Sequence, residues 1–310
     1  MRQHFFALQF AWITSSFLIG PSGVYGSSFE VIVGRYYLTQ SNLPYAQASF
    51  ANATDAEGKV LKALTSLALL QSETNAVSLV SAFHYVSPAN IWQAQSAGYS
   101  KHPSTPTPYR TATGTRGAQV VSLLRNVHLP AFTQAENDLA NFTDNSQLIP
   151  LGRSETGNPD INLDRGDILM IRSLLACGRF LAYFANSQNI DVIINDYILL
   201  EEEPGPVTIE KILSRFPDLA KLATASDLPV ARNEAKNAIA LYKQASDYIR
   251  SSRPLGVVRL FNLPGSFGVK TGEIYTASLA DEAKFRAKLD EYAALMDGPA
   301  PMTGLDNGLS

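Results

Sequence analysis

Residues 30–58, EVIVGRYYLTQSNLPYAQASFANATDAEG, carry the pattern that decides the fold. Two stretches of helical length each pair a small residue with an aromatic one, Gly34 with Tyr37 and Ala46 with Phe50. A spacing of three or four residues places such a pair on one face of a helix. The small residues let two antiparallel helices touch, and the rings fill the space on either side. The stretch therefore predicts a helical hairpin.

The same residues resemble the tetratricopeptide repeat, in which Trp-x2-Leu-Gly-x2-Tyr is followed by Ala-x3-Phe and a Pro. The Gly-x2-Tyr and Ala-x3-Phe elements are both matched, and Val33 takes the Leu position. Two positions depart from the pattern, because Glu30 replaces the Trp and Gly58 stands where Pro is usual.

One repeat later, 34 residues on, the first helix still fits. Leu64, Leu67 and Ala68 take the Trp, Leu and Gly positions, whereas Val80 and His84 stand where Ala and Phe belong. The resemblance is thus limited to residues 30–85. Since about three stacked repeats are needed for stability, residues 27–85 are expected to pack against later helices. The resemblance implies a single all-α domain, in which tetratricopeptide-like hairpins merge into an irregular multi-helix body.

The rest of the chain divides by composition. Residues 86–118 are rich in Pro, Ser, Thr and Gly and are expected to be a long loop. Helical spacing returns over 119–298, with polar loop expected at 144–160 and one short strand at 257–261. Residues 299–310 have no core-forming pattern, so they read as a tail or a linker to something absent from this chain.

Within 119–298, apolar residues at helical spacing mark one face of each of three expected helices. Asp164 or Asp167 is expected to cap the long helix that follows, to about 186, and Thr208 a shorter one. The three faces are Leu129, Phe132, Ala135, Leu139 and Phe142; Ile209, Ile212, Leu213 and Phe216; and Phe285, Leu289, Tyr292 and Leu295.

Residues 1–26 have the pattern of a secretory signal peptide. Arg2 is followed by an uncharged apolar run of 16 residues, from Phe5 to Gly20, and Val24-Tyr25-Gly26 forms a cleavage site that leaves Ser27 first. The alternative is a membrane anchor, but the run is short for a span of about 20 residues. A later apolar stretch, 168–185, is interrupted by two arginines and is expected to be a core helix. The mature protein is expected to be secreted or periplasmic, without stable membrane insertion.

Composition excludes several classes of function. The chain is 45% hydrophobic and 17% charged with a net charge of −3, which argues for a folded protein and against nucleic acid or an anionic membrane surface as partner. A single cysteine, Cys177, excludes a disulfide framework and a cysteine-rich zinc site. That cysteine lies in an apolar stretch and is expected to be an unreactive buried thiol.

Catalytic groups are scarce. Beyond the signal peptide the chain has only His84, His102 and His128, and it has no nucleophile elbow, zinc-binding helix motif, phosphate loop or dinucleotide fingerprint. The acidic run from Asp160 to Asp164 hints at a calcium loop, but Ile171 stands where the bidentate acid belongs, so helix capping is the better interpretation. We therefore expect no catalytic residue, no metal and no cofactor.

The leading hypothesis is a non-catalytic binding or scaffold protein whose partner is a protein or peptide. In helical repeat stacks the binding surface is the concave face of successive helices. In this chain that face is predicted to present Tyr36, Gln40, Thr65 and Gln71, which lie off the packing stripe and favour a polar segment. The alternatives are a structural segment of a larger cell-envelope or secreted assembly and, third, an exported hydrolase using His102 or His128.

Overall fold

A computed structural model describes seven ranges of the chain: 28–83, 110–156, 160–204, 206–251, 260–262, 274–275 and 279–298. Several expectations lie outside the described residues: the signal peptide, the 86–109 part of the loop, His84, His102, residues 257–259 and the tail. Within the described ranges helices dominate, and the strands are two or three residues long. The predicted all-α class is confirmed.

The N-terminal hairpins begin at helix caps that the sequence supplies. The side chains of Ser28, Asn42, Asp55 and Glu73 each accept a hydrogen bond from the backbone N–H three residues later, which satisfies a donor that the helix leaves free. The helices are α2 (Phe29–Thr39), α3 (Leu43–Ala51), α4 (Ala56–Leu69), the short 3-10 helix η1 (Leu70–Ser72) and α5 (Thr74–Ala82).

A second group of helices follows the 86–118 segment. It consists of α7 (Gly117–Leu123), a π-helical turn η2 (Leu124–His128) and α8 (Leu129–Leu139), with Pro130 in the first turn of α8. The stripe predicted from Leu129 to Phe142 is buried, each of its residues being at most 7% exposed.

The prediction of a polar loop over 144–160 is wrong. This region contains β1 (Ile149–Leu151) and α9 (Arg153–Thr156), and β1 pairs antiparallel with β2 (Ile161–Leu163). Ile149, Leu151 and Leu163 are at most 1% exposed. Strands of three residues are too short for an alternating pattern to stand out among polar neighbours, although their apolar side chains reach the core.

Helix α10 (Arg165–Ser187) is capped as predicted. The Asp164 carboxylate accepts from the Asp167 N–H, and the Asp167 carboxylate accepts from the Asp164 N–H, at 3.1 Å each. The second Asp167 oxygen accepts from the N–H of Phe261, in β3 (Phe261–Asn262), at 2.9 Å. Strand β3 pairs parallel with β4 (Ile274–Tyr275), so this carboxylate ties a late segment to the start of the central helix.

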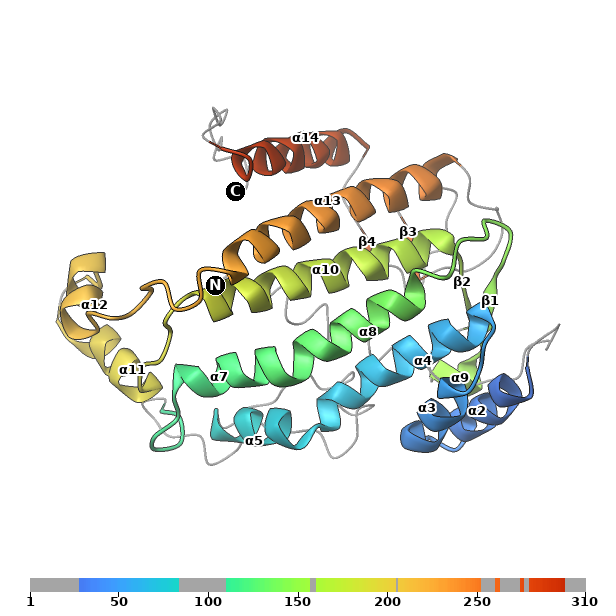
Figure 1. Cartoon of the computed structure of the whole chain (residues 1–310), viewed down its shortest axis with the longest axis horizontal. Coiled ribbons are helices and arrows are strands. Elements are labelled where there is room, and N and C mark those ends of the chain that lie inside the picture. The colour runs from blue at the N-terminus through green and yellow to red at the C-terminus, as the bar shows by residue number, and fades with distance from the viewer. Residues whose placement is uncertain are drawn as a thin grey trace.

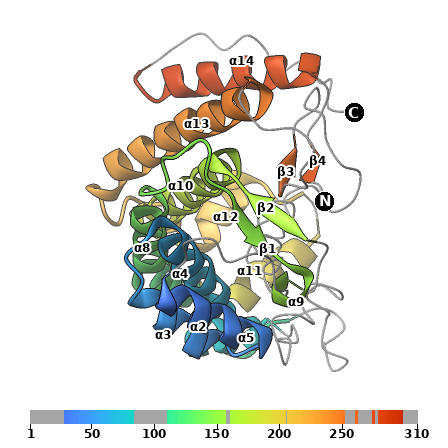
Figure 2. The ribbon, with the colours of Figure 1, turned by 90° about the vertical axis from the view of Figure 1, so that its right-hand side faces the viewer.

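The long helices form a stack in which each contacts the next along the chain (Figures 1 and 2). From one end to the other the order is α2, α3, α4, α8, α10, α13 (Asp227–Ser251) and α14 (Leu279–Leu295). By length and composition α10 is apolar enough to cross a membrane, but half of its apolar window is buried. It packs between α8 and α13, the position of the predicted core helix.

Between α10 and α13 the chain leaves the stack and forms an arm, residues 196–219, that carries most of α11 (Ile194–Glu202) and all of α12 (Ile209–Arg215). The neck of the arm is closed by backbone hydrogen bonds. The Asn189 N–H donates to the Lys221 carbonyl at 2.7 Å, and the Ala220 N–H donates back to Asn189 at the same distance.

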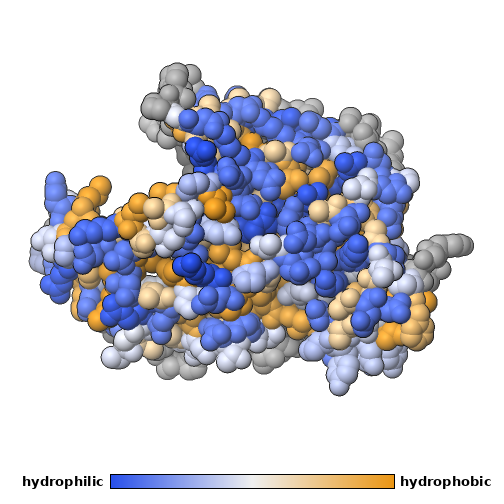
Figure 3. Space-filling view, in the orientation of Figure 1, coloured by the Kyte–Doolittle hydropathy of each residue, from blue (hydrophilic) through white to orange (hydrophobic). Residues whose placement is uncertain are grey.

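Two of the three apolar faces predicted from the sequence are largely exposed. On α12, Ile209 is 75% and Leu213 43% exposed; on α14, Phe285 is 50% and Tyr292 40% exposed. Hydrophobic and hydrophilic patches alternate over the arm in Figure 3. The periodicity predicts an amphipathic helix correctly, but it cannot say whether the same chain supplies something to cover the apolar side.

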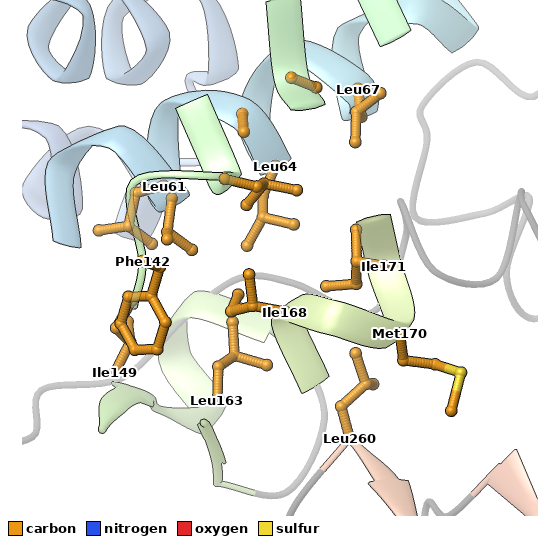
Figure 4. Close-up of a cluster of buried hydrophobic side chains, with 14 of the residues drawn as sticks. Leu61, Leu64, Leu67, Phe142, Ile149, Leu163, Ile168, Met170, Ile171 and Leu260 are labelled. Carbon is orange, nitrogen blue, oxygen red and sulfur yellow. The ribbon is translucent and has the colours of Figure 1, made fainter. Parts of the chain in front are cut away.

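The core lies between α4 and α10, where Leu61, Leu64 and Leu67 of α4 approach Ile168 and Ile171 (Figure 4). Leu260, just before β3, Phe261 of β3, and Ile149 and Leu163 of the β1–β2 pair belong to the same cluster. Among the described residues, the core cluster draws on α2, α3, α4, α8, α10, α13 and these strands, and includes no residue of α11, α12 or α14.

Candidate binding surface

The contact between α2 and α3 is built on Gly34 and Phe50. A methyl group placed on Gly34 would lie 2.3 Å from the Phe50 ring, so only glycine allows the helices to approach so closely. The other residues assigned to repeat packing are also at the interface. Tyr37 is half-buried against the core, and Ala46, Phe50, Leu64, Leu67 and Ala68 are at most 4% exposed.

Gly58, the residue that departs from the repeat pattern, also has a structural reason. A methyl group there would lie 2.2 Å from the Ala53 side chain. The Gly58 N–H donates to the Asp55 carboxylate at 2.7 Å, and proline has no such donor. The turn into α4 therefore excludes the proline that the repeat usually carries.

The four predicted partner-binding residues do not form one surface. Tyr36 is 60% exposed, and Gln40 is exposed at the end of α2, where its amide donates to Thr39. Gln71 is half-buried in η1. Thr65 is 3% exposed and its hydroxyl donates to the Leu61 carbonyl at 2.6 Å, so the expectation that it is free to meet a partner is wrong.

The predicted concave face is filled by the chain itself. Helix α4 contacts α3 on one side and α8 on the other, and Lys62 of α4 forms an ion pair with Asp138 of α8 at 2.9 Å. Stacking onto α8 completes the core that the two repeat-like units lack, and this leaves no open groove beside Thr65.

The exposed surface lies instead on the outer side of α2 and α3. Phe29, Ile32 and Tyr36 follow one another along α2 and are 74%, 45% and 60% exposed; Tyr45 of α3 is 60% exposed. Tyr37 lies between them, its ring centroid 5.7 Å from that of Tyr36 and 5.3 Å from that of Tyr45. We call the four exposed residues the aromatic face. Figure 3 shows hydrophobic surface at this end of the molecule.

Sequence reasoning missed the aromatic face although its signal was present. The residues at positions 29, 32 and 36 have helical spacing, but the repeat pattern assigns the packing face of this helix to the stripe around Gly34 and Tyr37. A short helix with apolar residues on two sides is buried on one of them and open on the other, and the sequence does not say which.

A buried ionic cluster holds α2 in place beneath this surface. The Arg35 guanidinium is 8% exposed and donates to Glu57 of α4 at 2.6 Å, to Glu155 of α9 at 2.6 Å and to the Pro150 carbonyl of β1 at 2.9 Å. Glu155 is 2% exposed, and its second oxygen accepts from the Gly152 N–H at 3.0 Å. One side chain thus joins α2 to three elements from two distant parts of the sequence.

One guanidinium serves two carboxylates in this cluster. Burial raises the pKa of Glu155 above its ordinary value, although Arg35 and the Gly152 N–H favour the anion. Burial disfavours the charged form of Arg35, but the two carboxylates prevail and raise the pKa of this residue. The two raised pKa values thus have different causes: burial for Glu155, and the neighbouring carboxylates for Arg35.

The stability of the protein should therefore contain a pH-dependent contribution from Glu155. A carboxyl with a raised pKa in the folded state contributes stability fully below its unfolded pKa, near 4.5, and loses it as pH rises through the folded pKa. In Glu155→Gln this contribution is absent. We expect the melting temperature of the variant to rise relative to wild type from pH 4.5 upward.

Differential scanning fluorimetry between pH 4 and pH 8 measures this effect. Glu210→Gln, which removes an exposed carboxylate on α12, is the matched control and should follow the wild-type curve. A constant offset between the Glu155→Gln and wild-type curves at every pH would contradict the assignment.

His128 and Cys177, the described residues considered for catalysis, lie in surroundings that a structural role explains. His128 lies in the π-helical turn, with Nδ1 3.3 Å from the Leu123 carbonyl and its ring edge-on to Phe132; burial lowers its pKa. Burial raises the pKa of the Cys177 thiol, which disfavours the thiolate that a nucleophile needs.

The acidic run from Asp160 to Asp164, considered above as a calcium loop, makes structural contacts. Asp164 caps α10, Asn162 lies in β2, and the Asp160 carboxylate accepts from the Arg153 N–H at 2.6 Å. Across the described ranges, no group of three or more His, Cys, Asp or Glu side chains is placed to hold a metal ion.

Comparison with known proteins found no match: no family model, no curated protein and no solved structure matches the chain.

Proposed function

We propose that the mature chain is an exported, non-catalytic binding or scaffold protein, and that it docks a partner protein on the aromatic face. The observation that carries the proposal is that Phe29, Ile32, Tyr36 and Tyr45 lie open on two adjacent helices whose opposite sides are buried in the core. Tyrosine and other aromatic residues are enriched at protein interfaces and dominate their binding energy.

The chemistry of the face favours an apolar partner surface. Helix α3 has no charged residue, and the two ionisable side chains of α2 other than tyrosine are Arg35, which is buried, and Glu30. The α2 residues of the face span seven positions, about 10 Å at 1.5 Å per residue, which is two turns of a helix. We therefore propose the apolar side of an amphipathic helix as the occupant, with the tyrosine hydroxyls at its edge.

The architecture is compatible with this role. A stack in which each helix contacts the next along the chain is the general form of helical repeat proteins, which commonly serve as binding scaffolds. Together with the close contact between Gly34 and Phe50, this order supports the tetratricopeptide-like interpretation as a proposal for α2 to α4.

A specific observation favours a second candidate, a structural segment of a larger assembly. The arm and its neck expose Ile209, Leu213 and Leu222, the last of them 55% exposed. These residues lie away from the aromatic face, and a subunit that contacts two neighbours needs two such surfaces.

One experiment separates the two candidates. The chain is recovered from the exported fraction of its native host after chemical cross-linking, as wild type and as two triple variants. The first is Phe29→Ala, Tyr36→Ala, Tyr45→Ala; the matched control is Ile209→Ala, Leu213→Ala, Leu222→Ala. All six residues are exposed, so both variants should keep the wild-type circular dichroism spectrum.

The binding proposal expects the cross-linked partner to be lost from the first variant and kept by the second. The assembly alternative expects the second variant to lose a neighbour. If both variants retain every cross-link, the aromatic face has no docking role. Recovery of the wild-type chain with residues 1–26 intact would contradict the exported part of the proposal.

A further inference from the structure

Helix α13 carries a straight row of cations. The row consists of Arg232 and three residues that lie 4, 11 and 18 positions after it: Lys236, Lys243 and Arg250. At 100° per residue, the four fall within about 40° of one another around the helix. At 1.5 Å per residue the row is about 27 Å long. We call these four residues the cation row.

In the structure α14 lies over the cation row, antiparallel to α13. Lys236 forms an ion pair with Asp297, Lys243 with Asp290, and Arg250 with Glu282. Arg232 donates to the Met296 carbonyl at 3.2 Å, at the end of α14 where the helix dipole is negative. Every cation of the row therefore meets negative charge or a carbonyl of α14.

The remaining contacts between the helices are few. Arg286 of α14 donates to Asp247 of α13 at 2.7 Å, and Tyr242 and Ser246 donate to Glu282. The apolar contacts include an edge-to-face pair between the rings of Tyr242 and Phe285, with centroids 5.4 Å apart. No described α14 residue belongs to the core cluster, and the Asp290 and Asp297 side chains are 67% and 61% exposed.

We propose that the cation row is a docking surface for an acidic helix of a partner protein, and that α14 is an intramolecular occupant that competes for it. This surface is distinct from the aromatic face and does not depend on the function proposed for it. The expected partner segment has the charge pattern of α14. It is a helix in which one acidic residue is followed by two more, about 8 and 15 positions later, as Glu282 is followed by Asp290 and Asp297.

The physics of the contact makes it reversible. Two of the three ion pairs, those of Asp290 and Asp297, involve exposed carboxylates, so they contribute little individually and are screened by salt. The third pair, between Arg250 and Glu282, is buried, but α14, unlike α2 to α13 of the stack, adds no described residue to the hydrophobic core. An occupant tethered in the same chain competes at an effective concentration near the millimolar range. A partner segment therefore gains access when α14 is weakened by charge change or salt, or when its own affinity exceeds that of α14.

The probe is a fluorescent peptide of residues 279–298 of this chain, cross-linked between positions 283 and 287 so that it is helical. Both positions are exposed alanines. Binding is measured by anisotropy to the full chain and to an opened variant, Glu282→Lys, Asp290→Lys, Asp297→Lys. We expect the opened variant to bind the peptide about tenfold more tightly than wild type, since the tethered competitor is lost. Binding should weaken steeply between low and physiological salt.

Two controls test charge recognition. A peptide with lysine at 282, 290 and 297 should not bind the opened variant. The fourfold swap Lys236→Glu, Lys243→Glu, Asp290→Lys, Asp297→Lys should regain the wild-type melting temperature, because the pairs re-form with reversed sign, and should refuse the natural peptide. The proposal is overturned if the folded opened variant binds no peptide, if both peptides bind it equally, or if salt leaves binding unchanged.

Discussion

Phe50→Ala is expected to lower the free energy of unfolding by about 3–5 kcal/mol, the range for removing a fully buried aromatic side chain. Phe50 is 0% exposed, and its ring fills the space that Gly34 leaves open between α2 and α3. Its loss removes the apolar burial and leaves a cavity that the two helices cannot collapse around without shifting. Urea denaturation followed by circular dichroism measures the change.

Phe29→Ala is the matched control for this experiment. It deletes the same side chain from the same hairpin, but Phe29 is 74% exposed. Its effect should stay within about 0.5 kcal/mol, as for other surface substitutions. Equal losses for the two variants would mean that the α2–α3 contact is not the one described.

The second large effect is expected for Arg35→Ala, at about 3–5 kcal/mol of unfolding free energy. The substitution removes the guanidinium from the buried Glu155 and the half-buried Glu57, and an uncompensated buried charge costs more than the ion pair itself contributes. Arg116→Ala removes an arginine from an exposed pair with Asp191, whose side chains are 46% and 41% exposed, and should cost far less, because exposed ion pairs are screened by solvent and salt.

Chemical denaturation at pH 7 distinguishes the two variants. The loss in Arg35→Ala should shrink when Glu155→Gln is added, because the double variant buries one charge fewer. A loss that is independent of Glu155 would place the role of Arg35 in packing and not in charge compensation.

The parts of the fold that local chemistry determines were predictable from the sequence. A cap needs one side-chain oxygen and one N–H three residues away, so Asp164, Asp167 and Thr208 mark helix starts wherever they stand. The pairing of Gly34 with a ring of α3 is also local, because the two helices adjoin in the chain. The central position of α10 follows from its length and apolar surface.

What the sequence could not give depends on distant partners. Arg35 and Glu155 are 120 positions apart in the sequence, and no pattern near Arg35 indicates that Glu155 is its partner. The repeat pattern predicts a free face around Thr65 because α8, which packs against α4, comes more than sixty residues later. The same limit explains α12 and α14, whose apolar stripes are real but stay largely exposed, with Ile209 at 75% and Phe285 at 50%.

The closed neck of the arm has a consequence for how this protein can vary. Backbone bonds at 189 and 220–221 bring the two ends of the excursion together. Residues 190–195 are bonded to the segment before α7 and Leu200 of α11 is 3% exposed, so the part that can lengthen or shorten while α10 and α13 keep their contact is the exposed stretch around α12, residues 207–219. Insertions are tolerated where both ends are held and the intervening backbone lies outside the core. Among relatives, this stretch of the arm is where length differences should accumulate, and in the laboratory it is the site at which a reporter domain can be inserted into the uninterrupted helical stack.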